Sequence, residues 1–469
     1  MFSKAISVVQ REHVALLIFV IIGGVLRGHG LFERSLWFDE VFSVNVSNPA
    51  NSLNTVFQLT VEDVHPPLYQ ILLWLVHQVF GYGERVGRIF SLVLSVAVIP
   101  SMYCLGAALF NRRVGVIAAL LSTVSFILVV EAQETRSYSL LVLLMVWSLL
   151  MFFNLLETQN FRTVLLYSVV GSMLVNTHYF GFLPMAAQLF LLIYFSIRAG
   201  FERRLFSASA IAGLLICSSL IPLFQYLLKN FGRTGTWIKK PAESFFIDMF
   251  VVQFGSLPVV LLCLFLLVLA LVKLFRVQDK KDVLKVLLFC WFFGVTVAYL
   301  RSLFFTPILT LKNAMVFLPI TIVLVSYGFG LVRDGFVRWT MLIFVCGVSA
   351  SFILSDPDRS QFRIESDLRS PVKKVMEEGR DLPVYANSVY SDYLQILGSS
   401  VRTKSFEELK RQLKAGSTGP CFYVIDPDAD ELSSYSKQLD TMVVEKNDYQ
   451  QSSIALLKSR DGADCISRR

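Results

Sequence analysis

The strongest constraint on the fold is a series of long apolar runs that continues from about residue 14 to about residue 354. A run of about 20 apolar residues can cross the hydrocarbon core of a bilayer as a helix. The chain is 55% hydrophobic and 17% charged, with a mean hydropathy of +0.60, which excludes an ordinary soluble protein. The sequence therefore predicts an α-helical polytopic membrane protein.

The apolar runs predict about eleven transmembrane helices. They are expected near residues 14–31, 87–110, 114–131, 138–156, 164–178, 180–197, 206–228, 245–275, 284–303, 314–332 and 338–355. Every second junction between them is rich in Lys and Arg, which places these junctions and the N-terminus in the cytoplasm. The excess of basic residues thus reports topology, and no nucleic-acid partner is expected.

The polarity of the chain changes after about residue 355. We expect a transmembrane domain over residues 1–355 and a small soluble α/β domain over residues 356–469 on the outer side. In the second part, strand-like runs (PVYAN, CFYVIDP, TMVVEKN, SIALLK) alternate with helical ones (SVYSDYLQIL, SFEELKRQLKAG). Cys421 and Cys465 lie in this part, where oxidising conditions permit a disulfide, and the sequence leaves their pairing open.

The first outer loop, residues 32–86, is long and polar at two places. SLWFDE ends in the adjacent acids Asp39 and Glu40, and EDVHPPLYQ contains Asp63 and His65. Long loops tend to carry function, and a carboxylate can act there as a general base. The structural alternative is a solvated turn in which Asp39 caps a helix and His65 only caps or packs.

Isolated cations occur at other outer turns. Arg136 lies in QETRSY with Glu134, and Lys312 follows TPILTL. Separated cations near a carboxylate would hold a phosphate beside a deprotonated base. Each cation alone could instead snorkel to the interface. A magnesium or manganese site made by Asp39, Glu40, Asp63 and His65 is a further alternative, although their spacing matches no known metal motif.

The segments SLWFDE, DVHPPLYQILLW, QETRSYSL, NTHYF and TPILTLKNAMVFLP occur in this order. Together they resemble the GT-C glycosyltransferases, of the type of the dolichyl-phosphate-mannose protein mannosyltransferases and the bacterial aminoarabinose and galacturonic acid transferases. The resemblance covers roughly residues 10 to 355. It implies a membrane enzyme that transfers a sugar from a polyprenyl-monophosphate donor to a lipid, glycan or protein acceptor on the outer face, with inversion.

The resemblance also implies roles for individual residues. Asp39 looks like the catalytic acid of the first loop with Glu40 as its partner, and His65, Arg136 and Lys312 would bind the donor phosphate. Lys312 departs from the pattern, because related enzymes often have an arginine there. The remaining predicted substrate contacts are Asp63, Glu134, Tyr138, His178 and Tyr179. The expected location is a bacterial inner membrane, with the C-terminal domain in the periplasm.

Two other function classes are compatible with a polytopic chain. A transporter or flippase of a lipid-linked glycan usually places ionisable residues near the bilayer midplane, often in repeated halves. The predicted spans are almost free of acids at their centres and show no convincing repeat. A membrane-anchored assembly protein would instead bind its partner through the C-terminal part. The sequence favours the enzyme.

Overall fold

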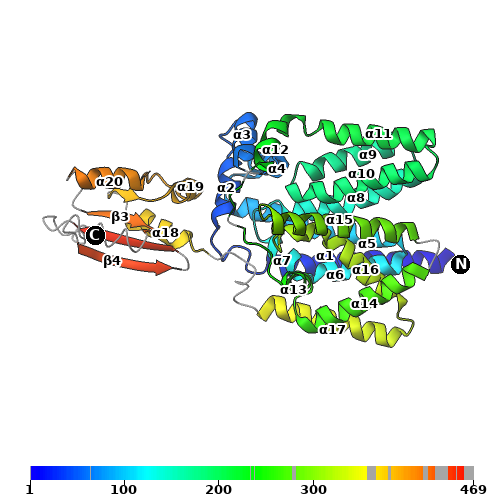
Figure 1. The fold of residues 1–469 in the computed structure, drawn as a ribbon. Coiled ribbons are helices and arrows are strands. Elements are labelled where there is room, and N and C mark those ends of the chain that lie inside the picture. The colour runs from blue at the N-terminus through cyan, green and yellow to red at the C-terminus, as the bar shows by residue number, and fades with distance from the viewer. Residues whose placement is uncertain are drawn as a thin grey trace. The chain divides into compact units, whose positions relative to one another are not determined.

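Helices make up most of the chain up to residue 355 (Figure 1). The computed structural model describes residues 2–63, 65–232, 234–236, 238–276, 281–355, 366–378, 382–415, 421–427, 442–449 and 452–458. These residues form two units. Unit 1 contains Met1–His29, Ser52–Leu72 and Arg88–Pro357, and unit 2 contains Gly30–Asn51, Leu73–Gly87 and Asp358–Arg469. Each unit is described by itself.

The helices up to residue 355 have the following bounds. They are α1 (Phe2–Gly28), α2 (Phe38–Val46), α3 (Leu53–Asp63), α4 (Leu68–Phe80), α5 (Glu84–Leu109), α6 (Arg112–Thr123), α7 (Phe126–Ala132), α8 (Tyr138–Glu157), α9 (Phe161–Val175), α10 (Phe182–Arg198), α11 (Arg203–Ser218), α12 (Phe224–Phe231), α13 (Phe245–Phe254), α14 (Leu257–Arg276), α15 (Lys281–Phe304), α16 (Leu318–Leu331) and α17 (Gly335–Ser355). Short 3-10 turns cover Tyr179–Gly181, Ile221–Leu223 and Asn313–Phe317.

The structure confirms a helical polytopic membrane protein but gives fewer spans than predicted. Among the described residues, eight helices are long and apolar enough to cross a membrane, or nine if the bent pair α6 and α7 is one span. The predicted spans near 14–31 and 164–178 are helical but do not belong to this set. One reason is length, because α9 has only 15 residues where about 20 are needed.

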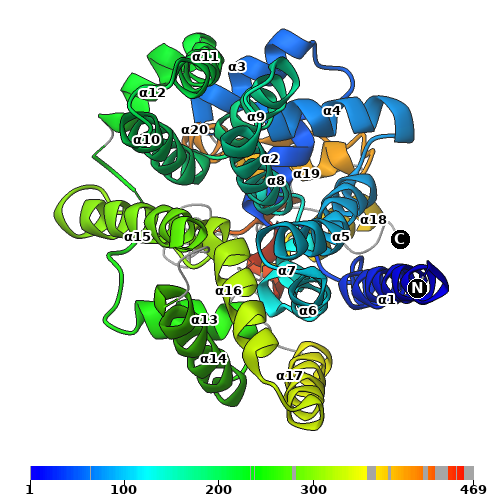
Figure 2. The same ribbon diagram turned by 90° about the vertical axis from the view of Figure 1, so that its right-hand side faces the viewer.

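Two of the predicted spans are broken. The span predicted over 114–131 is divided into α6 and α7, which meet at a bend of 55°. The span predicted over 245–275 is divided into α13 and α14 at Gly255, whose φ of 92° belongs to the left-handed region that glycine adopts without strain. Within unit 1, α16 packs against α14 and α6, as the end-on view of the helices shows (Figure 2).

Arg27, in the last turn of α1, fills the break between α6 and α7. Its side chain is completely buried. The guanidinium donates to the carbonyl oxygens of Ser122 (2.9 Å), Thr123 (3.1 Å) and Gly23 (3.1 Å), and to Oγ of Ser95 (2.8 Å). Carbonyl groups at a helix end have no intrahelical partner, so this cation satisfies the oxygens that the bend releases.

Unit 2 contains a five-stranded sheet in the order β2-β1-β3-β5-β4. The strands are β1 (Val384–Tyr385), β2 (Thr403–Lys404), β3 (Cys421–Ile425), β4 (Met442–Tyr449) and β5 (Ser452–Lys458), and the helices are α18 (Arg369–Glu378), α19 (Ser388–Ile396) and α20 (Phe406–Lys414). β1 is parallel to β2 and β3, whereas β5 is antiparallel to β3 and β4. The predicted small α/β layer is thus confirmed as a mixed sheet with helices.

Alternation along β3 divides the interior of unit 2 between the two faces of the sheet. Tyr423 and Ile425 belong to a buried cluster with residues of α18 and α19, whereas Phe422 and Val424 belong to a second cluster with residues of α20. Both faces of β3 are therefore covered, which explains its continuous apolar sequence CFYVI.

The N-terminal stretch of unit 2 comes from the first outer loop. Leu36, Val41 and Val44 join the buried cluster of α18 and α19. A domain boundary between residues 355 and 356 would keep all of loop 32–86 with the membrane helices, but residues 30–51 and 73–87 are grouped with the C-terminal chain. The first unit therefore retains residues 52–72 of the loop.

Cys421 opens β3 and is disulfide-bonded. Cys465, the other cysteine of the C-terminal part, lies outside the described residues. The five cysteines of the apolar helices are free thiols, of which Cys263 and Cys290 are buried and Cys104 and Cys217 are exposed.

The role of Arg27 predicts a specific loss of stability. Arg27→Met should lower the melting temperature of the purified protein by several degrees, because each orphaned buried carbonyl costs about 1–3 kcal/mol. Arg27→Lys should recover part of the loss, since an ammonium group still offers three donors. Arg113→Met, at an exposed position of α6, is the control. A melting temperature of Arg27→Met equal to that of the wild type would contradict this role.

Candidate active site

The predicted site residues belong to both units. Asp39 and Glu40 lie on α2 in unit 2, whereas the others, from Asp63 to Lys312, lie in unit 1. In each unit the helix ends and turns determine where these side chains point.

The turn between α7 and α8 carries Glu134 and Arg136. Nε2 of Gln133 donates to the carbonyl oxygens of Arg27 (2.9 Å) and His29 (2.7 Å), which ties the end of α7 to the end of α1. The backbone N–H of Arg136 donates to the carbonyl of Glu134 at 2.8 Å. The turn is therefore tight, and both side chains are buried, with exposed fractions of 3% for Arg136 and 4% for Glu134.

Arg136, His65 and Asp63 form a chain of hydrogen bonds. Nη2 of Arg136 lies 3.0 Å from Nε2 of His65, and Nδ1 of His65 lies 2.8 Å from Oδ2 of Asp63. A guanidinium group can only donate, so Nε2 of His65 must accept and Nδ1 must carry the proton. The imidazole is thus neutral in this arrangement and is oriented by the Asp63 carboxylate. Three residues predicted from sequence are brought together here.

Lys312 is paired with two buried carboxylates. Its Nζ lies 2.8 Å from Oε2 of Glu134 and 3.3 Å from Oε1 of Glu131. Burial lowers the pKa of Lys312, but the carboxylate charges of Glu131 and Glu134 outweigh it and raise the pKa above its ordinary value. The ammonium group is therefore charged, and a phosphate would have to share it with two acids.

Glu131 is a residue that the sequence interpretation missed. It lies in α7 and its side chain is fully buried. The available signal was a carboxylate at the end of an otherwise apolar run, since ionisable groups at membrane depth usually have a partner and a function.

Tyr138 and His178 also face each other, with ring centroids 5.4 Å apart. Nδ1 of His178 accepts the backbone N–H of Phe180 at 3.1 Å, so the proton of a neutral ring is on Nε2. Burial is the main cause that lowers the pKa of His178 to about 3. The hydroxyl oxygen of Tyr179 accepts a hydrogen bond from Asn230 at 2.7 Å.

The two acids of α2 have different surroundings within unit 2. Glu40 is 1% exposed, and its Oε2 accepts the backbone N–H of Trp37 at 3.4 Å at the start of the helix. The cap is therefore made by Glu40, and the alternative in which Asp39 caps this helix is wrong. Asp39 is partly exposed and lies about 170° around the helix from the mean direction of Val41 and Val44, which are buried. Of the two carboxylates, Asp39 is the accessible one.

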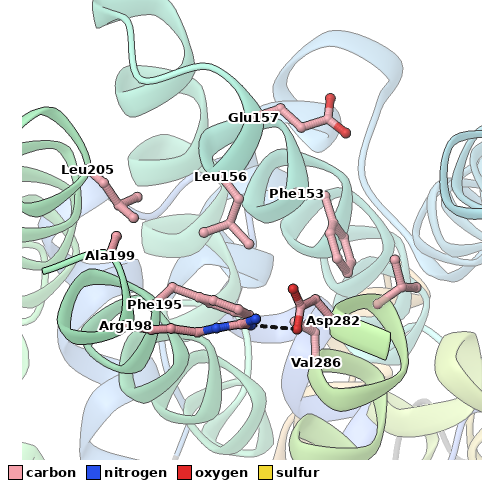
Figure 3. A pocket seen from close by; sticks show the side chains of 10 residues that line it. Phe153, Leu156, Glu157, Phe195, Arg198, Ala199, Leu205, Asp282 and Val286 are labelled. Carbon is pink, nitrogen blue, oxygen red and sulfur yellow. Dashed lines mark hydrogen bonds and ion pairs between the residues drawn. The ribbon is translucent and has the colours of Figure 1, made fainter. Parts of the chain in front are cut away.

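A pocket of about 430 Å³ lies elsewhere in unit 1 and contains none of the predicted site residues (Figure 3). It is lined at the C-terminal end of α8 by Phe153 and Leu156, at the end opposite to Tyr138. Nη1 of Arg198 donates to Oδ1 of Asp282 at 2.9 Å across it. This pocket is therefore separate from the candidate active site.

The metal hypothesis receives no geometric support from the described part of the chain. No group of three or more His, Cys, Asp and Glu side chains in it could hold a metal ion. Of the four residues proposed as ligands, Asp63 and His65 bind each other by a hydrogen bond.

Comparisons with known proteins agree with the resemblance. Residues 64–222 match the family model described as dolichyl-phosphate-mannose-protein mannosyltransferase. The structure is similar to ArnT from Cupriavidus metallidurans in the apo state, with 11% identity, a TM-score of 0.63 and coverage of 94% of this chain and 97% of that one. The same protein bound to undecaprenyl phosphate gives a TM-score of 0.62 with 11% identity, again covering 94% of this chain and 97% of that one.

A more distant similarity links the chain to the archaeal oligosaccharyltransferase AglB from Archaeoglobus fulgidus, solved with an inhibitory peptide and a dolichol-phosphate. The identity is 11%, the TM-score is 0.57, and the alignment covers 88% of this chain and 69% of that one. No curated protein sequence matches the chain. The family match confirms the predicted GT-C resemblance and the predicted enzyme class, a glycosyltransferase. The structural likeness confirms an ArnT-like fold.

The buried neutral imidazole of His178 predicts a pH effect on stability. An unfolded histidine has a pKa near 6.5, so the folded state binds fewer protons than the unfolded state between about pH 6.5 and pH 3. Stability from His178 is complete above this window and is lost as the pH falls through it. The melting temperature of His178→Gln should therefore fall less steeply from pH 6.5 to 4 than that of the wild type. His13→Gln, on the exposed side of α1, is the control, and equal slopes for wild type and His178→Gln would contradict the assignment.

Proposed function

We propose that this chain transfers a sugar from a polyprenyl-monophosphate donor to an acceptor on the outer face of the membrane, with inversion at the anomeric carbon. The observation that carries the proposal is the partly buried contact of Arg136 with His65, inside the segment that matches the mannosyltransferase family. An arginine at membrane depth suits a lipid-linked phosphate, because its fork can bind two phosphate oxygens at once.

The solved relatives support the choice of donor. ArnT has been solved with undecaprenyl phosphate and AglB with dolichol-phosphate, and both are polyprenyl monophosphates. The identities of 11% restrict these structures to evidence on the fold, so the donor of this chain is part of the proposal. The proposed acceptor is an envelope lipid, glycan or protein.

The proposed reaction is a single displacement. The acceptor oxygen or nitrogen attacks the anomeric carbon as the bond from that carbon to the phosphate oxygen breaks, and polyprenyl phosphate leaves with the electron pair. Arg136 stabilises the departing charge, with Lys312 as the second candidate cation. Asp39 takes the proton of the acceptor as the sugar carbon becomes electron-deficient. No covalent sugar on the protein is needed.

The surroundings of the two acids support this division of roles. Glu40 is buried and caps α2, which suits an orienting residue, whereas Asp39 is partly exposed and can receive a proton from substrate. The basic junctions support an outer location for α2 and for the C-terminal part, because they mark the cytoplasmic ends of the spans. The proposal therefore includes a location in a bacterial inner membrane, with the active site on the periplasmic side.

The base assignment predicts the behaviour of Asp39→Asn. Asparagine keeps the size of the side chain but cannot accept the proton, so turnover should fall by about 10²-fold or more while donor binding persists. The measurement is release of undecaprenyl phosphate from a panel of undecaprenyl-phosphate sugars, with purified protein and total envelope extract as acceptor. Glu62→Gln, an exposed acid of the same loop, should remain active. Full turnover of Asp39→Asn would remove the proposed base.

The phosphate assignment predicts a different pattern for Arg136. In the same assay Arg136→Ala should raise the donor KM by about 10-fold to 100-fold, the value expected for a lost charge-assisted pair. Arg136→Lys should recover only part of the affinity, because a point charge replaces the fork. Arg113→Ala, in an exposed basic junction, is the matched control. Unchanged donor affinity in Arg136→Ala would exclude this residue from the donor site.

A further inference from the structure

The segment that leads into α2 is held by one arginine of the C-terminal chain. Arg369 is the first residue of α18, and its side chain is 16% exposed. Its Nε donates to Oη of Tyr393 at 3.3 Å. Its Nη1 donates to the carbonyl oxygens of Phe32 (3.2 Å) and Glu33 (3.4 Å). Its Nη2 donates to the carbonyl oxygen of Arg34 and to Oε1 of Glu84 (3.1 Å). A guanidinium group has five N–H donors, so each one has an acceptor here.

Tyr393, on α19, completes this arrangement. Its hydroxyl donates to Oε2 of Glu84 at 3.0 Å and accepts the backbone N–H of Leu36 at 3.3 Å. The backbone N–H of Arg369 adds a bond to Oγ of Ser35 at 3.0 Å. Arg369, Tyr393 and Glu84 therefore form a clamp, named here the Arg369 clamp, on the residues that immediately precede α2.

The helix itself is fixed by packing. Leu36, Val41 and Val44 are no more than 1% exposed and belong to the cluster that includes Tyr390 and Tyr393 of α19. Val41 and Val44 are three residues apart and share one face of the helix. This face is buried in unit 2, which leaves Asp39 on the other side.

The chain that follows α2 is held as well. Nδ1 of His77 lies 2.9 Å from the carbonyl oxygen of Ser47, and Nε2 of Gln78 donates to the carbonyl of Pro49 at 2.9 Å. Nε1 of Trp74 donates to the carbonyl of Asn51 at 3.0 Å. Side chains from α4 thus fix the exit of α2, while the Arg369 clamp fixes its entry.

We infer that the C-terminal α/β part of unit 2 positions the catalytic carboxylate, and that Arg369 and Tyr393 are positioning residues for Asp39. The inference rests on the proposed function, in which Asp39 is the base. A base must lie within hydrogen-bond reach of the proton it removes, and a misplacement of about 1 Å can cost about 10²-fold in rate. Loops alone hold a side chain less accurately than packed helices do. The Arg369 clamp and the packing of α2 against α19 fix the position of α2 and so of the Asp39 side chain.

The test uses full-length purified protein and the undecaprenyl-phosphate-sugar assay. Arg369→Ala should lower kcat by about 10-fold to 100-fold and change the donor KM by less than about 2-fold, because the phosphate contacts are made by other residues. Arg369→Lys keeps the charge but not the five donors and should be impaired less. Tyr393→Phe, which removes only the hydroxyl, should lower kcat by about 3-fold to 10-fold. Arg411→Ala, at an exposed position of α20, is the matched control.

A double-mutant cycle separates positioning from a general structural role. If Arg369 acts through Asp39, Arg369→Ala should reduce the residual rate of Asp39→Asn by less than about 2-fold, whereas independent effects would multiply. The inference would be overturned if the rate losses of Arg369→Ala and Asp39→Asn multiplied in the double variant. It would also be overturned if Arg369→Ala changed only the donor KM. Thermal unfolding reports whether each variant is folded. Should Arg369→Ala not fold, wild-type turnover in both Arg369→Lys and Tyr393→Phe would overturn it.

The outcomes also separate this inference from the proposed function. Full activity of Asp39→Asn would overturn the base assignment and the positioning role together. Loss of activity in Asp39→Asn with normal kcat in a folded Arg369→Ala would overturn only the positioning role. A lower kcat in both Asp39→Asn and Arg369→Ala, without multiplied effects in the double variant, supports both the base assignment and the positioning role.

Discussion

Carbonyl oxygens at a helix break inside a bilayer cannot be satisfied by water, and the candidate active site depends on how one break is repaired. The side chain of Arg27 satisfies the end of α6, and its carbonyl oxygen accepts from Gln133 at the end of α7. The last turn of α1 thus fixes the C-terminal end of α7 and satisfies the end of α6 that precedes it. Glu134 and Arg136 follow directly, so their positions derive from an arginine that takes no part in the proposed chemistry.

The two cations of the candidate site in unit 1, Lys312 and Arg136, have different described neighbours. Lys312 lies directly against Glu131 and Glu134, whereas Arg136 contacts an imidazole that separates it from the Asp63 carboxylate. An ion pair at contact distance in a buried site is expensive to open. A phosphate that binds Lys312 would therefore compete with two carboxylates.

The sequence predicted the parts of this structure that depend on local pattern. Apolar runs predicted the helices, and the strand-like runs CFYVIDP and SIALLK predicted β3 and β5. The break between α6 and α7 was missed because Arg27, which satisfies the carbonyl oxygens at this break, is 95 and 96 positions away from them in the sequence. The membership of residues 30–51 in unit 2 was missed for the same reason, since no local pattern encodes a partner hundreds of residues away.

The Arg369 clamp joins parts of the chain that are far apart in the sequence and are therefore synthesised at different times. Ser35 and Tyr393 are separated by 358 positions. At about 5–20 residues per second, roughly 20 to 70 s pass between the synthesis of α2 and the synthesis of the helix that packs on it. During this interval α4 can hold the exit of α2, but the entry of α2 lacks the Arg369 clamp. On the proposed positioning role, a chain that stops short of α19 would carry every residue of the proposed chemistry and still lack the geometry for it, so activity would begin only after α19 is made.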